Sequence, residues 1–172
     1  IPLNQYRNFH PKAAEIIHHM AMDVDFVIID HYEMGVYLES MENTKLVYHA
    51  HNAEFKLWER LASLEKEPLK KRAISLETQR VIRAEKLLME SCAINFMARS
   101  DKDKFKDLGI EVPNYRETKH LGTDAWVMLP NIEFSATEKC LFYMGSLSWP
   151  ANSDGLVWFF KEVWPILLKD EP

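Results

Sequence analysis

Residues 45–54, KLVYHAHNAE, form an apolar run that ends in imidazole, amide and carboxylate groups. Leu46, Val47 and Tyr48 suit a buried strand, whereas polar side chains are costly to bury without partners. We therefore expect a strand over Lys45–His49 whose carboxyl end lies at a polar edge of a sheet. Ligands bind at that edge in open α/β sheets, so the stretch predicts a functional site.

Helical and strand patterns alternate on both sides of this strand. Helices are predicted over Pro11–Met22, Gly35–Met41, Phe55–Ala62, Pro68–Ser91 and Asp101–Leu108, and strands over Asp25–Asp30, Ala93–Ala98 and Thr118–Leu121. Ser100 is placed to cap the helix that follows it, and Gly109 to stop that helix. The alternation predicts a parallel sheet with right-handed crossovers. The fold class is therefore α/β, a Rossmann-like parallel sheet with flanking helices.

A polar connector then separates this region from a last strand, predicted over Lys139–Met144, and a last helix, predicted over Asn152–Lys169. We expect a first domain over residues 1–125, a linker over 126–138 and the start of a second domain over 139–172. One strand and one helix cannot make a domain alone. The chain is therefore expected to be a piece of a longer protein, or its last unit docks on the first domain or on a second copy. Its first residue, Ile1, has no signal core after it and is interpreted as an internal starting point.

Composition narrows the function classes. The 172 residues carry a net charge of −5, which argues against general nucleic-acid binding, and no run of 18 apolar residues predicts a membrane span. Residues 56–86 nevertheless carry nine Lys or Arg against five Glu. This stretch is either a solvated helix face or a contact for anionic lipid or a phosphate-bearing substrate. Cys92 and Cys140 have no second cysteine near either, which indicates two reduced, buried thiols in a cytosolic protein.

Seven short blocks, in order along nearly the whole chain, resemble the nucleotide-sugar-dependent glycosyltransferases of family four, and most closely the bacterial transferases of polysaccharide assembly. They are DFVIID at 25–30, HNAE at 51–54, RAE at 83–85, ARSDKD at 98–103, LGTD at 121–124, YMGSL at 143–147 and WPANSD at 149–154. The resemblance implies a two-lobed B-type fold and transfer of a sugar, with retention of configuration, from a nucleotide sugar to a saccharide or lipid-linked acceptor. It also implies an enzyme that works without a cofactor or bound metal. The enzyme would be cytoplasmic, either free or peripherally bound at the inner face of the membrane.

The same resemblance implies parts that lie outside this chain. Family members have a glycine-rich loop in the first lobe and a pair of acidic residues in the second lobe that bind the donor. The chain corresponds to the second half of the acceptor lobe, the linker, and the first strand and helix of the donor lobe. We therefore expect these 172 residues to be inactive alone.

The resemblance assigns His51 to the cleft, in contact with the donor sugar near the reacting carbon, where an imidazole accepts a hydrogen bond from a hydroxyl. The alternative is a histidine that bonds a backbone group at the strand end. Glu54 would orient His51, bind an acceptor hydroxyl or favour the next helix through its dipole. Asn52 is a substrate-binding candidate, although an N-cap is the stronger reading of its position.

Gly145 and Ser146 are the candidates for contact with the donor pyrophosphate, because a glycine at a strand end lets backbone N–H groups approach phosphate oxygens. Trp149 and Asn152 are interpreted as turn and cap residues. In the block at 121–124, Leu121 stands where family members have asparagine, which removes a polar contact there.

Residues 30–33, Asp-His-Tyr-Glu, should line the same sheet edge as His51. Together with His49 they raise the alternative of a metal site, since imidazoles and carboxylates bind metals. No His-x-x-x-His helix or cysteine pair supports that alternative, and the resemblance implies that there is no metal. His18 and His19 are expected at the surface.

The last helix is rich in aromatic residues, among them Trp158, Phe160 and Trp164. Exposed in an isolated piece, they predict a homodimer through this helix, exchange of the segment, or aggregation. Three functions follow from the sequence: a glycosyltransferase, a non-catalytic α/β binding module derived from the same fold, and another sugar-nucleotide enzyme such as an epimerase.

Overall fold

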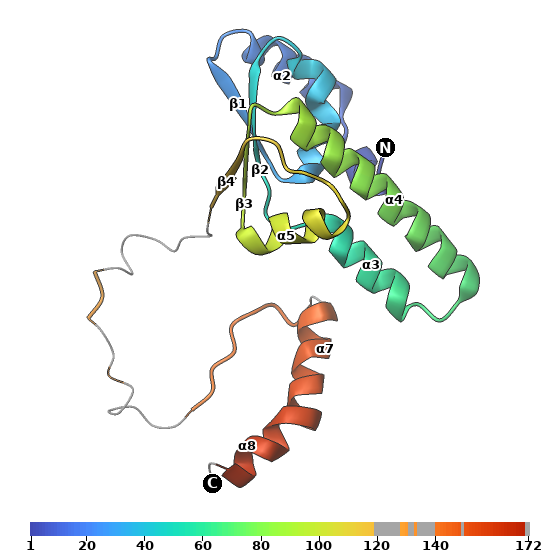
Figure 1. Ribbon diagram of the computed structural model, residues 1–172, viewed down its shortest axis with the longest axis vertical. Helices are drawn as coiled ribbons and strands as arrows, with labels where there is room; N and C mark the ends of the chain where they lie inside the picture. The colour runs from blue at the N-terminus through green and yellow to red at the C-terminus, as the bar shows by residue number, and fades with distance from the viewer. Residues whose placement is uncertain (119–127, 131–132, 134–139, 149, 171–172) are drawn as a thin grey trace. The chain divides into compact units, whose positions relative to one another are not determined.

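A computed structural model of the protein describes residues 1–118, 128–130, 133, 140–148 and 150–170 (Figure 1). The chain divides into two compact units, Ile1–Gly122 and Thr123–Pro172, and each is described here by itself. The predicted turn at 121–124, Trp126, Trp149 and most of the predicted linker lie outside the described residues.

The first unit alternates helices with strands, as the sequence predicts. Its helices are α1 (Leu3–Asn8), α2 (Pro11–Ala21), α3 (Glu54–Leu64), α4 (Pro68–Ser91), α5 (Arg99–Asp107) and the 3₁₀ helix η1 (Tyr32–Met41). Its strands are β1 (Phe26–Asp30), β2 (Lys45–His49), β3 (Ile94–Met97) and β4 (Tyr115–Glu117).

The four strands form one parallel sheet in the order β1-β2-β3-β4. The register pairs Asp30 with His49, and His49 with Phe96. The carboxyl ends of all four strands therefore meet at one edge of the sheet, and the prediction of an α/β fold with a parallel sheet and flanking helices is confirmed.

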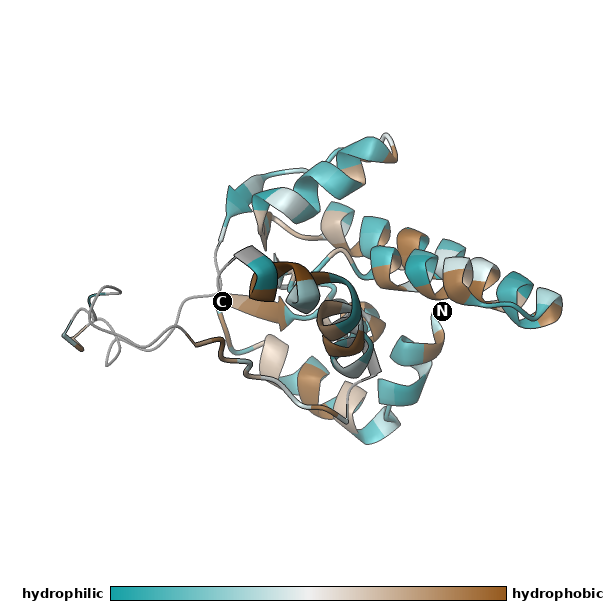
Figure 2. Ribbon diagram, turned by 90° about the horizontal axis from the view of Figure 1, so that it is seen from below, coloured by the Kyte–Doolittle hydropathy of each residue, from teal (hydrophilic) through white to brown (hydrophobic). Residues whose placement is uncertain are grey.

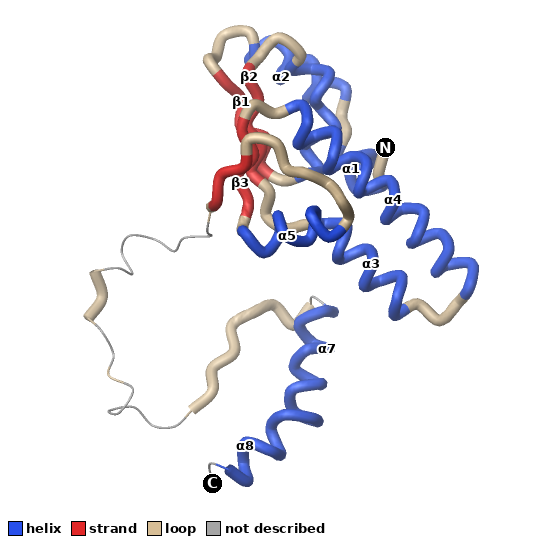
Figure 3. The backbone as a smooth tube through the Cα atoms, in the orientation of Figure 1, coloured by secondary structure: helices blue, strands red, loops and turns tan. Residues whose placement is uncertain are grey.

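The helices of the first unit gather on one side of the sheet (Figures 1 and 3). Ile29 of β1 faces them and is buried, whereas Phe26 and Ile28, at alternate positions of the same strand, are more than half exposed. Successive side chains of a strand point to opposite faces. The other face of β1 is therefore open to solvent in the part of the chain that the structure describes.

The core lies between the sheet and the helices. Figure 2 shows hydrophobic and hydrophilic residues alternating along the helical ribbons, as expected for helices with one buried face. The fully buried core side chains include those of Tyr48, Phe55, Val81, Leu88, Met89, Met97 and Phe105. Burial of each such apolar side chain stabilises the fold by roughly 1.5–3 kcal/mol.

Helix α4 begins and ends where the sequence predicts. Pro68 occupies its first turn, where a missing N–H removes no helical hydrogen bond. Val81, Glu85 and Leu88 follow at spacings of four and three residues and make its buried face. Two buried residues of α4, Glu77 and Glu85, are carboxylic acids, which the apolar pattern alone does not predict.

Gly35 lies where η1 packs closely on its neighbours. A Cβ on Gly35 would lie 3.0 Å from Nε2 of Gln5 and 3.3 Å from Cδ2 of Leu88. The Gln5 amide is itself buried and donates to the carbonyl of Tyr32. A side chain at position 35 would require the Gln5 and Leu88 side chains to give way by a few tenths of an ångström.

Helix α5 differs from the prediction at its start and agrees at its end. Its N-cap is Ala98, so Ser100 lies inside the first turn and the prediction that Ser100 caps the helix was wrong. Gly109 has a φ of 71° and donates its N–H to the carbonyl of Lys106. The prediction that Gly109 stops the helix is confirmed.

The fourth strand precedes its predicted position. Residues Tyr115–Glu117 pair with β3, and Thr118 only follows the strand; the rest of the predicted range 118–121 lies outside the described residues. The strand is short and partly exposed, and its largely polar sequence lacks the apolar run from which a buried strand is predicted.

The second unit is helical over its described end. Helix α7 (Pro150–Trp158) continues through a π turn, η3 (Phe159–Val163), into α8 (Trp164–Asp170), which confirms the predicted last helix. Trp164 donates its N–H to the carbonyl of Phe159 five residues earlier. The next residue is Pro165, which has no N–H to donate, and this accounts for the change in hydrogen-bond register at this point.

Residues 140–144, predicted to be a strand, are not in a strand in the structure. A strand needs a neighbour to accept and donate its backbone hydrogen bonds, and an apolar run cannot supply one. Cys140 is exposed while Cys92 is buried, so the prediction of two buried thiols holds for Cys92 alone. Trp158 and Phe160 are more than half exposed, as expected. Among the described residues, no helix combines the length and the apolarity needed to cross a membrane.

Candidate functional site

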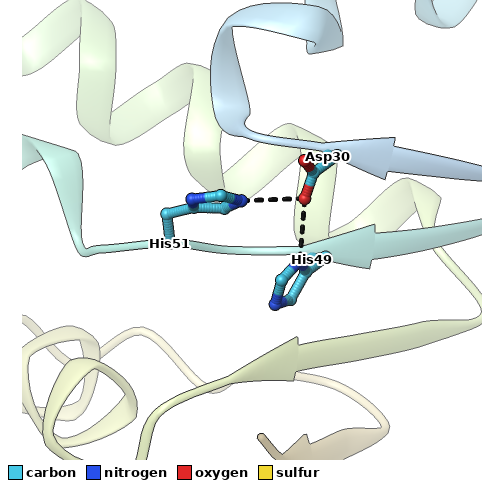
Figure 4. A group of neighbouring side chains, drawn as sticks. All are labelled: Asp30, His49 and His51. Carbon is cyan, nitrogen blue, oxygen red and sulfur yellow. Dashed lines mark hydrogen bonds and ion pairs between the residues drawn. The ribbon is translucent and has the colours of Figure 1, made fainter. Parts of the chain in front are cut away.

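The ends of β1 and β2 bring one carboxylate and two imidazoles together (Figure 4). Asp30 and His49 are register partners at the last position of each strand, and His51 follows two residues later. Asp30 Oδ1 lies 2.7 Å from His49 Nδ1 and 2.8 Å from His51 Nε2. The predicted shared edge of residues 30–33 and His51 is thus confirmed, at hydrogen-bond distance.

One carboxylate oxygen therefore accepts two N–H groups. Because an ionised carboxylate only accepts hydrogen bonds, each ring must carry a proton on the nitrogen that faces Asp30. These hydrogen bonds, first that of His51 and then that of His49, lower the pKa of the Asp30 carboxyl. Asp30 fixes the orientation and the tautomer of both rings, the role that a carboxylate beside a histidine has in many sites.

A third imidazole extends the group. The ring centroid of His31 lies 5.2 Å from that of His51. His31 has a φ of 79° and a ψ of 144°, a conformation that favours glycine, while its N–H still donates to the carbonyl of His49. The chain turns sharply here from β1 into η1. Strain held at the end of a strand beside a polar cluster is typical of functional sites.

Two carboxylates hold the His31 ring. Its Nε2 lies 3.4 Å from Glu54 Oε1. Its Nδ1 lies 2.6 Å from Glu33 Oε2, an ion pair whose geometry does not meet the angles of a hydrogen bond. The hydrogen bond to Glu54, together with the charges of Glu33, Glu54 and Asp30, raises the pKa of His31 against the opposing effect of burial. The side chains thus form one continuous series of contacts in space, in the order His49, Asp30, His51, His31 and Glu54.

Glu54 and Asn52 have partners other than those the sequence predicts. Glu54 is nearly buried and faces His31, while Asp30 holds His51. Of the three alternatives for Glu54, its place in the first turn of α3 is confirmed. The N-cap of α3 is Ala53, so the N-cap reading of Asn52 was wrong. Asn52 is exposed, and its Nδ2 donates to Glu54 Oε1 at 3.4 Å.

The start of α3 is capped instead by Glu85, a residue of α4. Its two carboxyl oxygens accept the N–H groups of Glu54 at 2.8 Å and of Phe55 at 3.1 Å. A helix leaves its first N–H groups without partners inside the helix, and Glu85 supplies acceptors for two of them. Asp101 completes the arrangement, since its Oδ1 accepts the N–H of Ala53 at 3.2 Å and pairs with Lys104.

Glu85 is fully buried, and this burial raises its pKa to about 8 against the opposing effect of the two backbone hydrogen bonds. The residues that follow His51 are therefore held by a buried carboxyl group whose pKa is well above that of an exposed glutamate. Neither Glu85 nor Asp101 was singled out by the sequence except within the family blocks. The available signal was a glutamate between Val81 and Leu88 on an apolar helix face.

Gly145 and Ser146 lie in the second unit. A Cβ on Gly145 would lie 2.5 Å from Tyr143 Oη, so a side chain there would require the Tyr143 ring to move. Ser146 Oγ lies 2.7 Å from Ser148 Oγ, and the Ser146 carbonyl accepts Asn152 Nδ2 at 3.0 Å. Gly145 does not end a strand, which removes one reason for the phosphate assignment, but that assignment itself stays a prediction.

Comparison of the chain with models of protein families, with curated proteins and with solved structures finds no match in any of the three. What the site can do must therefore follow from its own residues. Those residues place an oriented imidazole, His51, at the ligand-binding edge of a parallel sheet.

Proposed function

We propose that the protein is part of a retaining glycosyltransferase with a two-lobed B-type fold, which moves a sugar from a nucleotide sugar to a saccharide or lipid-linked acceptor in bacterial polysaccharide assembly. The first unit would be the Rossmann-like acceptor lobe, and the second the start of the donor lobe. The observation that carries the proposal is the hydrogen bond from His51 to Asp30 at the carboxyl edge of a parallel sheet.

In this proposal His51 contacts the donor sugar. Its Nε2 donates to Asp30, so its Nδ1 is in the form that accepts a hydrogen bond from a sugar hydroxyl. That contact orients the sugar and responds to charge that develops near the reacting carbon. Asp30 is a positioning residue, since it acts through the ring.

The rest of the site has supporting roles. Glu85 and Asp101 hold the loop that carries His51, through the backbone N–H groups of residues 53–55. Asn52 is exposed and available to acceptor hydroxyls, whereas Glu54 acts through His31. Gly145 and Ser146 would present backbone N–H groups to the donor phosphates.

Mass spectrometry of sugar transfer tests the proposal directly. The full-length protein that contains these residues is incubated with a panel of nucleotide sugars and with saccharide and lipid-linked acceptors. We expect transfer from one donor, and a fall of about 100-fold or more in His51→Ala, the size of effect that a group acting on the reacting centre usually has.

The matched control is His19→Ala, which removes an exposed imidazole from α2. It should leave transfer unchanged, and both variants should unfold at the wild-type urea concentration. Transfer that survives in His51→Ala would remove His51 from the reaction. Binding of a nucleotide sugar without transfer to any acceptor would favour the non-catalytic binding module.

A further inference from the structure

The group at the ends of β1 and β2 has a second chemical capacity. One ligand atom from each of Asp30, His49 and His51 lies within 4.8 Å of the other two. We propose that these three residues bind a divalent transition-metal ion of the zinc class. The proposal stands on their geometry and does not depend on the proposed sugar transfer.

The donor set selects the class of ion. Two imidazole nitrogens with one carboxylate oxygen suit zinc, cobalt and nickel, whereas calcium and magnesium prefer sites made of oxygen atoms. His49 ends β2 and His51 follows two residues later, and their ring centroids lie 4.9 Å apart. Asp30 supplies the third donor from the adjacent parallel strand.

The distances require only a small adjustment. Ligands about 2.0–2.1 Å from a tetrahedral ion are roughly 3.3 Å from one another. In the structure the two nitrogen–oxygen pairs are 2.7 and 2.8 Å apart, and the two nitrogens are at most 4.8 Å apart. An ion would open the first two separations by about half an ångström and bring the nitrogens closer together, changes that side-chain rotations supply.

The nitrogens that face Asp30 carry protons in the structure. Coordination through those nitrogens needs neutral rings with the proton on the other nitrogen, so each ring changes tautomer through solvent when the ion binds. No proton is gained or lost by a neutral ring in that exchange. The two hydrogen bonds to Asp30 are replaced by three metal–ligand bonds.

The surroundings favour a cation with an open coordination position. The side chains of His49 and His51 are about one third exposed and that of Asp30 is 62% exposed, so an ion reaches them from solvent. The carboxylates of Glu33 and Glu54 lie one step further away, on either side of the His31 ring. Three protein ligands with a fourth position for water are typical of catalytic rather than structural zinc sites.

The ion and the proposed sugar would compete for one ring. An ion on His51 Nε2 takes the place of the hydrogen bond that orients this ring. Zinc should therefore inhibit sugar transfer, and a chelator should restore it. Failure of the two proposals can be told apart, because metal binding is measured on the chain without any sugar substrate.

The test is a titration of the chelator-treated full chain with Co²⁺, followed by visible absorption, and with Zn²⁺, followed by calorimetry. We expect one equivalent to bind and the tetrahedral Co²⁺ absorption to appear. In His49→Gln and Asp30→Asn the affinity should fall at least tenfold, the size of effect that loss of a ligand or its partner has. A tenfold excess of Mg²⁺ should not displace the ion.

The control variant is His19→Gln, because His18 and His19 form another pair of adjacent imidazoles, exposed on α2. It should bind the ion as the wild type does. Urea unfolding of the metal-free variants separates loss of a ligand from loss of the fold, and a variant that unfolds early is replaced by His49→Asn. Absence of binding in the wild type, or an equal loss of affinity in His19→Gln, would overturn the proposal.

Discussion

Asp30 and Glu85 each carry a carboxyl group, on two sides of the loop that bears His51, but the first group is mostly exposed and the second is fully buried. The Asp30 carboxylate is mostly exposed, and hydrogen bonds from two imidazoles lower its pKa. The Glu85 carboxyl is fully buried, and burial raises its pKa to about 8. Position alone, not residue type, separates a group suited to contact with ligands from one suited to holding a loop.

Substitution of Glu85 and substitution of Asp30 should therefore affect different properties of the protein. Removal of Glu85 should damage the fold, because Glu54 and Phe55 would have N–H groups buried without acceptors. Removal of Asp30 should leave the fold intact and damage the site.

Glu85→Ala should lower the free energy of unfolding by about 3 kcal/mol, because it leaves two helix N–H groups unsatisfied and creates a cavity. Urea unfolding followed by circular dichroism measures this change. The control is Glu90→Ala, on the same helix, where the side chain is exposed and only pairs with Lys86 at 3.7 Å. That variant should lose less than about 0.5 kcal/mol; equal losses in the two variants would contradict the capping role.

The stability of the protein should fall as the pH rises from about 5 to about 8. The pKa of Glu85 is raised in the folded protein to about 8 from its usual 4.5, so the folded state binds the proton more tightly than the unfolded state. A group of this kind stabilises fully below its unfolded pKa, and its contribution is lost as the pH approaches the folded pKa. At about 1.4 kcal/mol per pH unit, we expect the free energy of unfolding to decrease by about 2 kcal/mol between pH 5.5 and pH 7, measured by urea unfolding at each pH.

Glu85→Gln is the control for this pH dependence. The amide keeps the size of the protonated acid and does not titrate. Its urea midpoint should change much less between pH 5 and pH 8 than that of the wild type. A slope that persists unchanged in Glu85→Gln would assign the pH dependence to other groups.

Asp30→Asn should slow sugar transfer by the full-length protein about tenfold, which corresponds to about 1.4 kcal/mol in the barrier. The amide keeps one oxygen as acceptor but loses the charge that fixes the two rings. Initial rates are measured with a chelator present, so that bound metal does not contribute. The urea midpoint should stay at the wild-type value, and a rate equal to that of the wild type would show that Asp30 does not position His51.

Much of the fold could be predicted from the sequence, because its elements carry strong local signals. The strand Lys45–His49 and the helix Pro68–Ser91 begin and end where the pattern and the first-turn proline place them. The strand Tyr115–Glu117 could not be placed because its sequence is largely polar and, among the described residues, it pairs with β3 alone. The predicted strand at 140–144 had the right composition but no partner in the described structure.

The candidate site could be predicted in part, for a related reason. The sequence placed Asp30 and His51 at one edge, since parallel strands end together. It did not show that Asp30 and not Glu54 holds His51, because that depends on the register between β1 and β2. The contact between Glu85 and the start of α3 joins residues 31 positions apart, and only the packing of α3 on α4 creates it.

The backbone of His31 also bears on how the protein can be made more stable. Glycine adopts a φ of 79° without strain, whereas a side chain there costs on the order of 1–3 kcal/mol. Engineering for stability would therefore favour glycine at this position. The same replacement would delete the ring that links Glu33 and Glu54 to the neighbouring imidazoles. His31 is a position where thermal robustness and the chemistry of the site draw on the same residue in opposite directions.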